Sequence, residues 1–230
     1  SISESEDGKV LVKCFAGCDQ LSVIDALKSK GLWPEQSKKK LHGKHSTLEE
    51  TQKKRIVETY DYCDRNNNLV YQIVRREPKS FPQRRPDGKG GWIWDLQGVT
   101  QFPYRFPDFI ECDSIVIVEG EKDVDRLWSF DIPATCNAMG AGKWPDELNQ
   151  YFTDKEVFII PDNDNAGRKH AEQVAASLKN TASQVRICPI CEDFPEKSDI
   201  SNWLDAGNDP DTLISRLKSF PERKPETTEE

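Results

Sequence analysis

Two stretches of the sequence decide the fold: IVIVEGEKD at residues 115–123 and VFIIPDNDNAGR at residues 157–168. Each begins with a run of β-branched and other apolar residues that is typical of a buried strand. Each run ends abruptly at acidic residues and a glycine, before a helical pattern begins. Two parallel strands of this kind would bring Glu119, Asp162 and Asp164 to one edge of a sheet, where open α/β sheets bind their ligands.

The chain from Ser114 onward alternates between strand patterns and helix patterns. This alternation predicts an α/β fold, with a parallel sheet, right-handed crossovers and flanking helices. We expect strands at residues 115–118, 134–137, 157–160 and 184–188, and helices at residues 124–130, 145–152, 166–178, 198–204 and 211–220. Residues 221–230 have too little apolar surface to bury and are predicted to be a disordered tail.

The N-terminal part of the sequence contains two cysteines in a CFAGC segment. Residues 9–13 are predicted to be a strand that leads into Cys14 and Cys18, and an amphipathic helix is expected from Leu21 to Leu32. The spacing of the cysteines is half of a zinc-ribbon ligand set, and four ligands are needed for a structural zinc site. The alternative is two small buried thiols beside a turn. A basic linker is expected at residues 34–55.

Residues 56–112 combine a hairpin pattern with a basic, aromatic segment. The hairpin is predicted at residues 56–74, and residues 101–109 are expected to form a connector on the surface. Between residues 69 and 94, six basic residues face only two acidic ones. Arginine can grip phosphates and aromatic rings can stack on unpaired bases, so this segment is predicted to bind single-stranded nucleic acid. The residues concerned are Arg75, Arg76, Lys79, Arg84, Arg85, Lys89 and Trp92. The alternative is a solvated hairpin with Trp92 and Trp94 in a small core.

The composition restricts the class of protein. The chain has 230 residues, 36% of them apolar, which is enough for at least one hydrophobic core. Its net charge of −8 argues against a protein that coats nucleic acid non-specifically. The seven cysteines are scattered and odd in number, which favours reduced thiols. No run is apolar enough to span a bilayer and no signal peptide is evident, so we expect a cytoplasmic location and no membrane partner.

The acidic residues of the two strand ends suggest a metal site. Asp162 and Asp164 are one residue apart on a chain that leaves a strand, an arrangement that suits Mg²⁺. Glu119 would be a further ligand or a general acid or base. Gly120 and Gly167 would let the backbone turn sharply beside the ligands. The alternative is a helix cap formed by the two aspartates and a solvated turn after Glu119.

The same two stretches resemble the TOPRIM domain shared by bacterial-type DNA primases, topoisomerases and some nucleases. The resemblance lies in EGxxD at residues 119–123 and DxDxAG at residues 162–167. The basic segment, with QRRP at residues 83–86, and the CFAGC segment resemble primase-like proteins of phages, plasmids and integrated elements. This implies a TOPRIM (Rossmann-like) parallel sheet at residues 113–206, followed by a C-terminal helix at residues 207–220. A smaller α+β basic subdomain and a zinc-ribbon remnant would precede it.

The resemblance also implies roles for single residues. Glu119, Asp162 and Asp164 would be catalytic and hold Mg²⁺ or Mn²⁺, with Asp123, Gly120 and Gly167 in support. Asp199 stands where bacterial-type primases have a third acidic motif, usually Lys-Asp-Pro-Asp, but the chain has Lys-Ser-Asp there. Arg168 would bind nucleic acid or nucleotide, and Lys143 would meet a phosphate at the end of the second strand. The alternative for Lys143 is a glycine-rich connector with a solvent-exposed lysine. Because such relatives have a Cys and His pair before the CFAGC position, we expect a fragment of a longer protein, in which Cys14 and Cys18 hold zinc only in the longer chain.

The function implied is that of a primase catalytic core, which makes short RNA primers on single-stranded DNA by metal-dependent nucleotidyl transfer. Its partners would be a single-stranded DNA template, ribonucleoside triphosphates and a replicative helicase. Two alternatives remain open: a TOPRIM nuclease that uses the same carboxylates, and a non-catalytic module that binds single-stranded nucleic acid in a replication complex.

Overall fold

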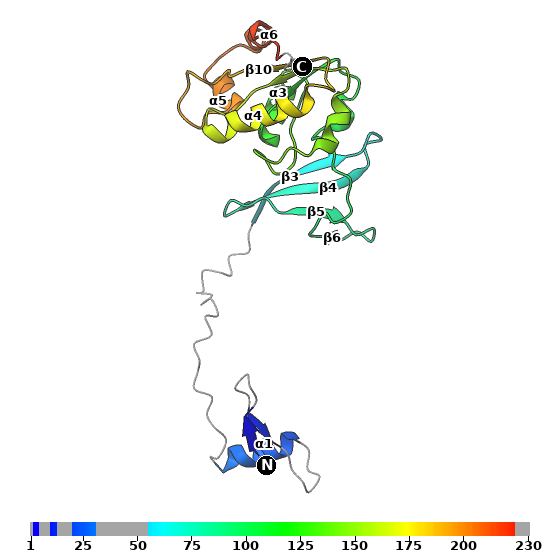
Figure 1. Cartoon of the computed structure of the whole chain (residues 1–230), viewed down its shortest axis with the longest axis vertical. Coiled ribbons are helices and arrows are strands. Elements are labelled where there is room, and N and C mark those ends of the chain that lie inside the picture. The colour runs from blue at the N-terminus through cyan, green and yellow to red at the C-terminus, as the bar shows by residue number, and fades with distance from the viewer. Residues whose placement is uncertain (1, 5–9, 13–19, 31–54, 224–230) are drawn as a thin grey trace, which may run out of the picture. The chain divides into compact units, whose positions relative to one another are not determined.

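The computed structural model describes residues 2–4, 10–12, 20–30 and 55–223 (Figure 1). The chain divides into two units, Ser1–Gln52 and Lys53–Glu230. No helix in these described ranges is both long and apolar enough to cross a membrane.

The first unit contains a two-stranded sheet and one helix. Strand β1 (Ile2–Glu4) pairs antiparallel with β2 (Val10–Val12), and helix α1 covers Gln20–Ser29. The strand and the helix expected here are therefore confirmed. The predicted zinc ligands Cys14 and Cys18 lie outside the described residues, as does the linker up to residue 54.

The second unit begins with an antiparallel sheet in the order β3-β4-β5-β6. Its strands are β3 (Arg55–Cys63), β4 (Leu69–Glu77), β5 (Gln83–Pro86) and β6 (Trp92–Ile93). The predicted hairpin is formed by β3 and β4. Asp64 shapes its turn, because the Asp64 carboxylate accepts hydrogen bonds from the backbone N–H groups of Asn66 and Asn68, both at 2.9 Å.

The rest of this unit is built on a parallel sheet in the order β10-β9-β7-β8. The strands are β7 (Ser114–Ile117), β8 (Ala134–Thr135), β9 (Glu156–Ile159) and β10 (Gln184–Ile187). The helices are α2 (Phe106–Phe109), α3 (Glu121–Trp128), α4 (Asn165–Leu178), α5 (Ile200–Asp205) and α6 (Pro210–Ser219). The α/β fold class and the parallel sheet are thus confirmed. The segment Asp146–Phe152, expected as an α-helix, is a 3₁₀ helix (η1).

Alternate residues of the parallel strands belong to two hydrophobic clusters, one on each face of the sheet. Ile115 and Ile117 join the cluster that includes apolar residues of α4 and η1. Val116 and Val118 join the other, together with residues of α3, α5 and α6. Tyr62 and other residues of the antiparallel sheet belong to this second cluster. The two sheets therefore share one core, which fixes the antiparallel sheet against the parallel one.

The connector at residues 101–109 is not the surface segment that the sequence suggested. Tyr104, Phe106 and Phe109 are buried. The Tyr104 backbone N–H donates to the Cys136 carbonyl at 3.0 Å, and the Thr135 hydroxyl donates to the Tyr104 carbonyl at 2.6 Å. Because β8 is the last strand of its sheet, these bonds cover its free edge. The aromatic residues that made the segment look like a linker are the residues that it buries.

Three residues of the predicted disordered tail, 221–223, are placed in the structure. The Arg223 backbone N–H donates to the Val185 carbonyl at 2.8 Å, and the Arg223 side chain pairs with Glu172 of α4. Residues 221–223 are therefore attached to the sheet. Residues 224–230 lie outside the described part of the chain.

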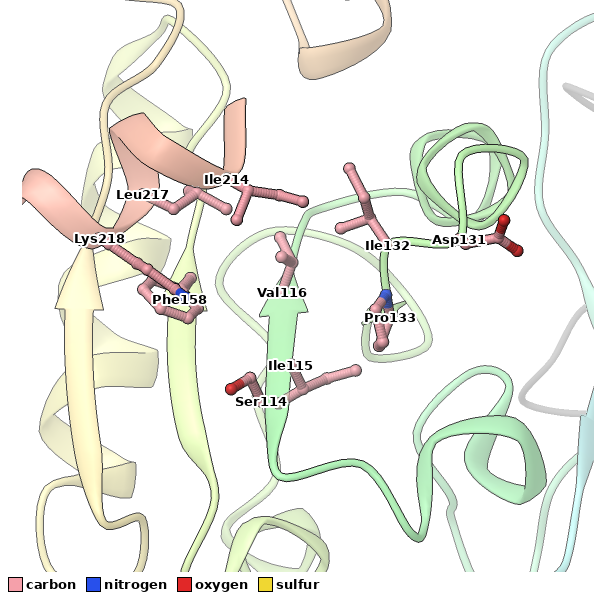
Figure 2. A pocket seen from close by; sticks show the side chains of 10 residues that line it. All are labelled: Ser114, Ile115, Val116, Asp131, Ile132, Pro133, Phe158, Ile214, Leu217 and Lys218. Atoms are coloured by element: carbon pink, nitrogen blue, oxygen red, sulfur yellow. The ribbon is translucent and has the colours of Figure 1, made fainter. Parts of the chain in front are cut away.

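An apolar hollow of about 170 Å³ lies near the amino end of the parallel strands (Figure 2). Ile214 of α6 and Ile132, from the turn before β8, lie on either side of Val116, and Phe158 forms part of the lining. The hollow is thus at the opposite end of β7 from Glu119, and it contains none of the predicted site residues.

Candidate active site

Three predicted carboxylates lie at the carboxyl ends of adjacent parallel strands. Glu119 follows β7, and Asp162 and Asp164 follow β9, which pairs directly with β7. The Asp162 backbone N–H donates to Glu119 Oε1 at 3.2 Å, so the two strand ends are in contact. We call these three residues, together with Asp123 and Asp199, the acidic edge.

Gly167 is what allows the strand ends to approach so closely. A Cβ atom at this position would collide with Glu119 Oε1 and would lie 2.6 Å from the Asp162 carbonyl oxygen. Real Cβ atoms do not come this close to backbone atoms, so only glycine fits. Gly120 differs from the expectation, because its φ of −128° is an extended conformation open to any residue. The chain passes from β7 into α3 at this residue, but the backbone conformation there does not require glycine.

Asp164 has a structural role in addition to its place at the acidic edge. It is the N-cap of α4, and its Oδ1 accepts a hydrogen bond from the Gly167 N–H at 2.8 Å. This is the cap that the sequence left open as an alternative for these aspartates. Asp162 is not the cap, and no hydrogen bond to its side chain is formed within the described residues.

Asp123 and Asp199 complete the acidic edge from two helix starts. Asp123 is buried in the first turn of α3, and its carboxylate accepts a hydrogen bond from the Ser201 hydroxyl. Asp199 is the N-cap of α5 and forms a capping box with Asn202. Ser201 was not among the predicted site residues. Its place beside Asp123 depends on how α5 packs against α3, which no local sequence pattern indicates.

Burial and mutual repulsion raise the pKa values of Asp162 and Glu119. The pKa of Asp162 rises to about 8, mainly through burial and then through Glu119, Asp123, Asp199 and Asp164. Burial also raises the pKa of Glu119, with Asp164 and Asp123 adding to the effect. Ionisation of Asp162 and Glu119 is therefore unfavourable in the protein alone, and a bound cation would favour it by offsetting the repulsion.

Tyr62 links the antiparallel sheet to this site and was also missed. Its buried hydroxyl donates to Glu121 Oε1 at 2.8 Å, two residues after Glu119. Burial raises the pKa of Glu121. The bond ties the start of α3 to β3, so the second sheet helps to fix the position of the acidic edge.

The donor set fits a hard divalent cation in its chemistry. Mg²⁺ and Mn²⁺ prefer carboxylate oxygens, and Glu119, Asp162 and Asp164 supply them from adjacent strand ends. The side-chain positions differ from a finished site: in the described residues, no group of three or more His, Cys, Asp or Glu side chains is arranged to hold a metal ion. Rotation of these partly buried carboxylates would be needed to bring the oxygens onto one ion.

Two residues predicted to bind nucleotide or nucleic acid lie near the same end of the sheet. Arg168 is in the first turns of α4 and donates to Asn165 Oδ1 at 2.8 Å. With Asp162 and Glu192 it lines a hollow of about 310 Å³. Lys143 is exposed in the loop that follows β8, and it forms no ion pair with any described residue. This loop is fixed by the Gly142 N–H, which donates to His170 Nδ1 at 3.0 Å.

The predicted nucleic-acid-binding residues divide between the two faces of the antiparallel sheet. Arg84 stacks on Trp92 at 3.9 Å and Arg76 on Trp94 at 4.3 Å, measured from guanidinium carbon to ring centroid. The register places Arg84 beside Gln72, on the face opposite to the buried Tyr71. We call Arg76, Arg84, Trp92 and Trp94 the stacked face. Trp94 is 47% exposed, so it is not part of the small core considered as an alternative.

The remaining basic residues of this segment are arranged differently. Arg75 pairs with Glu58 at 3.8 Å, and Arg85 pairs with Asp95 at 3.2 Å. Lys79 lies 5.9 Å from the ring centroid of Phe81, and Lys89 is exposed in the loop between β5 and β6. The stacked face therefore faces away from the shared core, and half of the predicted arginines are already paired with carboxylates.

Comparison with known proteins agrees with the fold and with the motifs at the acidic edge. Residues 116–204 match the protein family described as Toprim-like. This part of the chain is therefore similar to TOPRIM domains, and it contains all five carboxylates of the acidic edge. No curated protein matches the sequence.

The chain is also similar in fold to solved structures of DNA primases. The Aquifex aeolicus primase (zinc-binding and RNA polymerase domains) is 17% identical, with a TM-score of 0.55 over 89% of this chain and 50% of that one. The Escherichia coli primase catalytic core is 17% identical, with a TM-score of 0.53 over 71% of this chain and 52% of that one. A DNA primase domain from Pseudomonas aeruginosa is 20% identical, with a TM-score of 0.53 over 71% and 51%. The chain is primase-like in fold and spans about half the length of these proteins.

Proposed function

We propose that this chain is the catalytic core of a primase, which joins ribonucleotides into short RNA primers on a single-stranded DNA template. The observation that carries the proposal is the contact between the Glu119 and Asp162 strand ends at the carboxyl edge of a TOPRIM sheet. Open α/β sheets bind ligands at this edge, and nucleotidyl transfer needs clustered carboxylates there.

The acidic edge would hold Mg²⁺ or Mn²⁺ through Glu119, Asp162 and Asp164. A bound divalent ion lowers the pKa of an attacking hydroxyl and offsets the charge that develops on phosphate oxygens. Asp123 would be a positioning residue and not a ligand, because its side chain is buried and hydrogen-bonded to Ser201. Arg168 and Lys143, which flank the same end of the sheet, would contact the triphosphate of an incoming ribonucleotide.

The stacked face would contact single-stranded DNA. Its exposed Trp94 offers a ring to an unpaired base, and Arg76 and Arg84 supply positive charge beside it. A primase catalytic domain related in fold has been solved bound to single-stranded DNA. Association with a replicative helicase remains a prediction from the sequence resemblance.

A primer-synthesis assay tests the proposal. The whole chain is incubated with single-stranded DNA, ribonucleoside triphosphates and Mg²⁺ or Mn²⁺, and the RNA product is followed. We expect product from the wild type and a loss of about a hundredfold or more in Asp162→Asn and in Glu119→Gln. Asp113→Asn and Glu111→Gln are the matched controls, because both residues are exposed just before β7, at the other end of the strand.

The same assay separates the competing functions. Cleavage of DNA in the absence of nucleotides, if it is lost in Asp162→Asn, would show a nuclease in place of the proposed primase. A non-catalytic binding module would give no product. It would bind DNA in a salt-dependent way, with the same affinity in both variants as in the wild type and with or without added metal.

A further inference from the structure

Lys122 is the cation of the acidic edge. Its ammonium lies 3.0 Å from Asp199 Oδ2 and 3.7 Å from Asp123 Oδ1. Within the described part of the chain, no other salt bridge reaches any of the five carboxylates of the acidic edge. Lys122 belongs to the first turn of α3, three residues after Glu119, so it stands beside the predicted ligands.

Of the two carboxylates that Lys122 contacts, Asp199 has both oxygens occupied and Asp123 has its Oδ1 occupied. Asp199 Oδ1 accepts the Asn202 N–H at 2.8 Å and Asp199 Oδ2 accepts the Lys122 ammonium. Asp123 is buried and accepts the Ser201 hydroxyl. Glu119 and Asp162 differ, because no ammonium or guanidinium is paired with either of them in the described residues. The acidic edge is thus divided into a half that has its own cation and a half that does not.

We infer that the Lys122 ammonium takes the place of a second divalent cation, so that the acidic edge binds one divalent ion, on Glu119, Asp162 and Asp164. The inference rests on the proposed metal-dependent function. An ammonium between two carboxylates offsets their repulsion as a metal ion would, and it leaves Asp199 without a free oxygen for a metal. Lys122 is therefore a positioning residue, which sets how many ions the site takes.

A purely structural role for Lys122 has a different consequence. As a half-exposed ion pair, it would only hold the start of α3 against the start of α5, and such pairs contribute little. Its removal would then lower the melting temperature equally with and without divalent ions. The inferred role predicts instead that a divalent ion restores stability in a variant that lacks the charge.

Counting bound Mn²⁺ by electron paramagnetic resonance tests the inference on the whole chain. We expect one ion per chain in the wild type, two in Lys122→Met, and one in Lys122→Arg, which keeps the charge. The double variant Lys122→Met/Asp199→Asn should return to one ion. In thermal melts, added Mn²⁺ should raise the melting temperature of Lys122→Met by more than it raises that of Lys122→Arg.

The outcomes distinguish this inference from the proposed function. An unchanged count in Lys122→Met, or two ions already in the wild type, would overturn the role of Lys122. Loss of the wild-type ion in Asp162→Asn tests the catalytic metal site separately. A wild type without Mn²⁺ and a Lys122→Met variant with one ion would support the role of Lys122 and reject the metal site on Glu119, Asp162 and Asp164.

Discussion

The acidic edge and the stacked face treat charge in opposite ways. At the acidic edge, Asp162 is surrounded by other carboxylates, and its pKa is raised to about 8, first by burial and then by their repulsion. In the antiparallel sheet, Arg85 is paired with Asp95, and Arg84 rests on Trp92 and donates to Gln72 Oε1 at 2.7 Å. These basic side chains contact carboxylates or aromatic rings, whereas Glu119, Asp162 and Asp164 have no cationic partner among the described residues.

This difference indicates that the acidic edge lowers the stability of the fold. Uncompensated buried charge lowers the free energy of unfolding, and such sites are most often functional. The stacked face has no comparable cost, since cation–π stacking and the hydrogen bond from Arg84 to Gln72 hold it together without a ligand. A structural explanation therefore suffices for much of the stacked face, but not for the acidic edge. Variants of the two regions should respond differently.

The largest effect is expected at Gly167. In Gly167→Ala, the new Cβ would lie 2.6 Å from the Asp162 carbonyl oxygen and 2.9 Å from the Asp162 nitrogen, and backbone atoms cannot rotate away. Alanine favours a helix over glycine by about 1 kcal/mol. The clash should outweigh this gain and lower the free energy of unfolding by about 2–3 kcal/mol, as measured by urea denaturation.

Gly120→Ala is the matched control for this substitution. Its nearest atom would be Asp123 Oδ2 at 3.5 Å, which is an ordinary contact, and its backbone is extended. The change should be tolerated within about 0.5 kcal/mol. Equal losses of stability in the two variants would show that close packing between the strand ends does not explain Gly167.

A smaller effect of opposite sign is expected for Asp162→Asn. Because the pKa of Asp162 is raised to about 8 in the native state, the native protein binds more protons than the unfolded chain between about pH 4 and pH 8. Its stability therefore falls as the pH rises through this window. Asparagine removes that penalty, so the variant should melt higher than the wild type at pH 8.5, by about 2–4 °C for each kcal/mol gained.

Thermal melts without divalent ions, at pH 5.5 and pH 8.5, check this prediction. The advantage of Asp162→Asn should be larger at the higher pH, and added Mg²⁺ should reduce it by stabilising the wild type. Asp113→Asn, an exposed residue before β7, should change little at either pH. A lower melting temperature for Asp162→Asn at both pH values would contradict the repulsion that we describe.

The acidic edge could be predicted from the sequence because few alternatives were open. The apolar runs at residues 115–118 and 157–160 are too short and too β-branched for helices, and alternation with helices makes their strands parallel. Parallel strands end at one edge, so Glu119 and Asp162 had to meet. The roles of Lys122 and Ser201 were missed, because they depend on the packing of α5 against α3, which no local pattern reports.

The arrangement of the basic segment was less predictable for a different reason. Two neighbouring residues of a strand point to opposite faces, so Arg84 and Arg85 had to separate, but the sequence does not tell which one faces the core. Register with Gln72 decides it. Trp94 is exposed and Tyr104 is buried, although both are aromatic residues in neighbouring segments. The presence of an aromatic residue in the sequence therefore does not tell whether its side chain is buried.

The smallest effect is expected for Trp94→Ala, which should weaken binding of single-stranded DNA without changing stability much. Stacking of a base on an aromatic side chain contributes about 1–3 kcal/mol. Arg76 already covers one side of the ring, so we expect the lower end, roughly a fivefold rise in Kd. Fluorescence anisotropy with an oligonucleotide at fixed salt concentration measures this change in Kd.

Phe130→Ala is the control, because Phe130 is also exposed and stacked with an arginine, Arg126, but lies outside the stacked face. If both variants bind as the wild type does, the stacked face is a structural feature of the sheet, and single-stranded DNA must be held elsewhere.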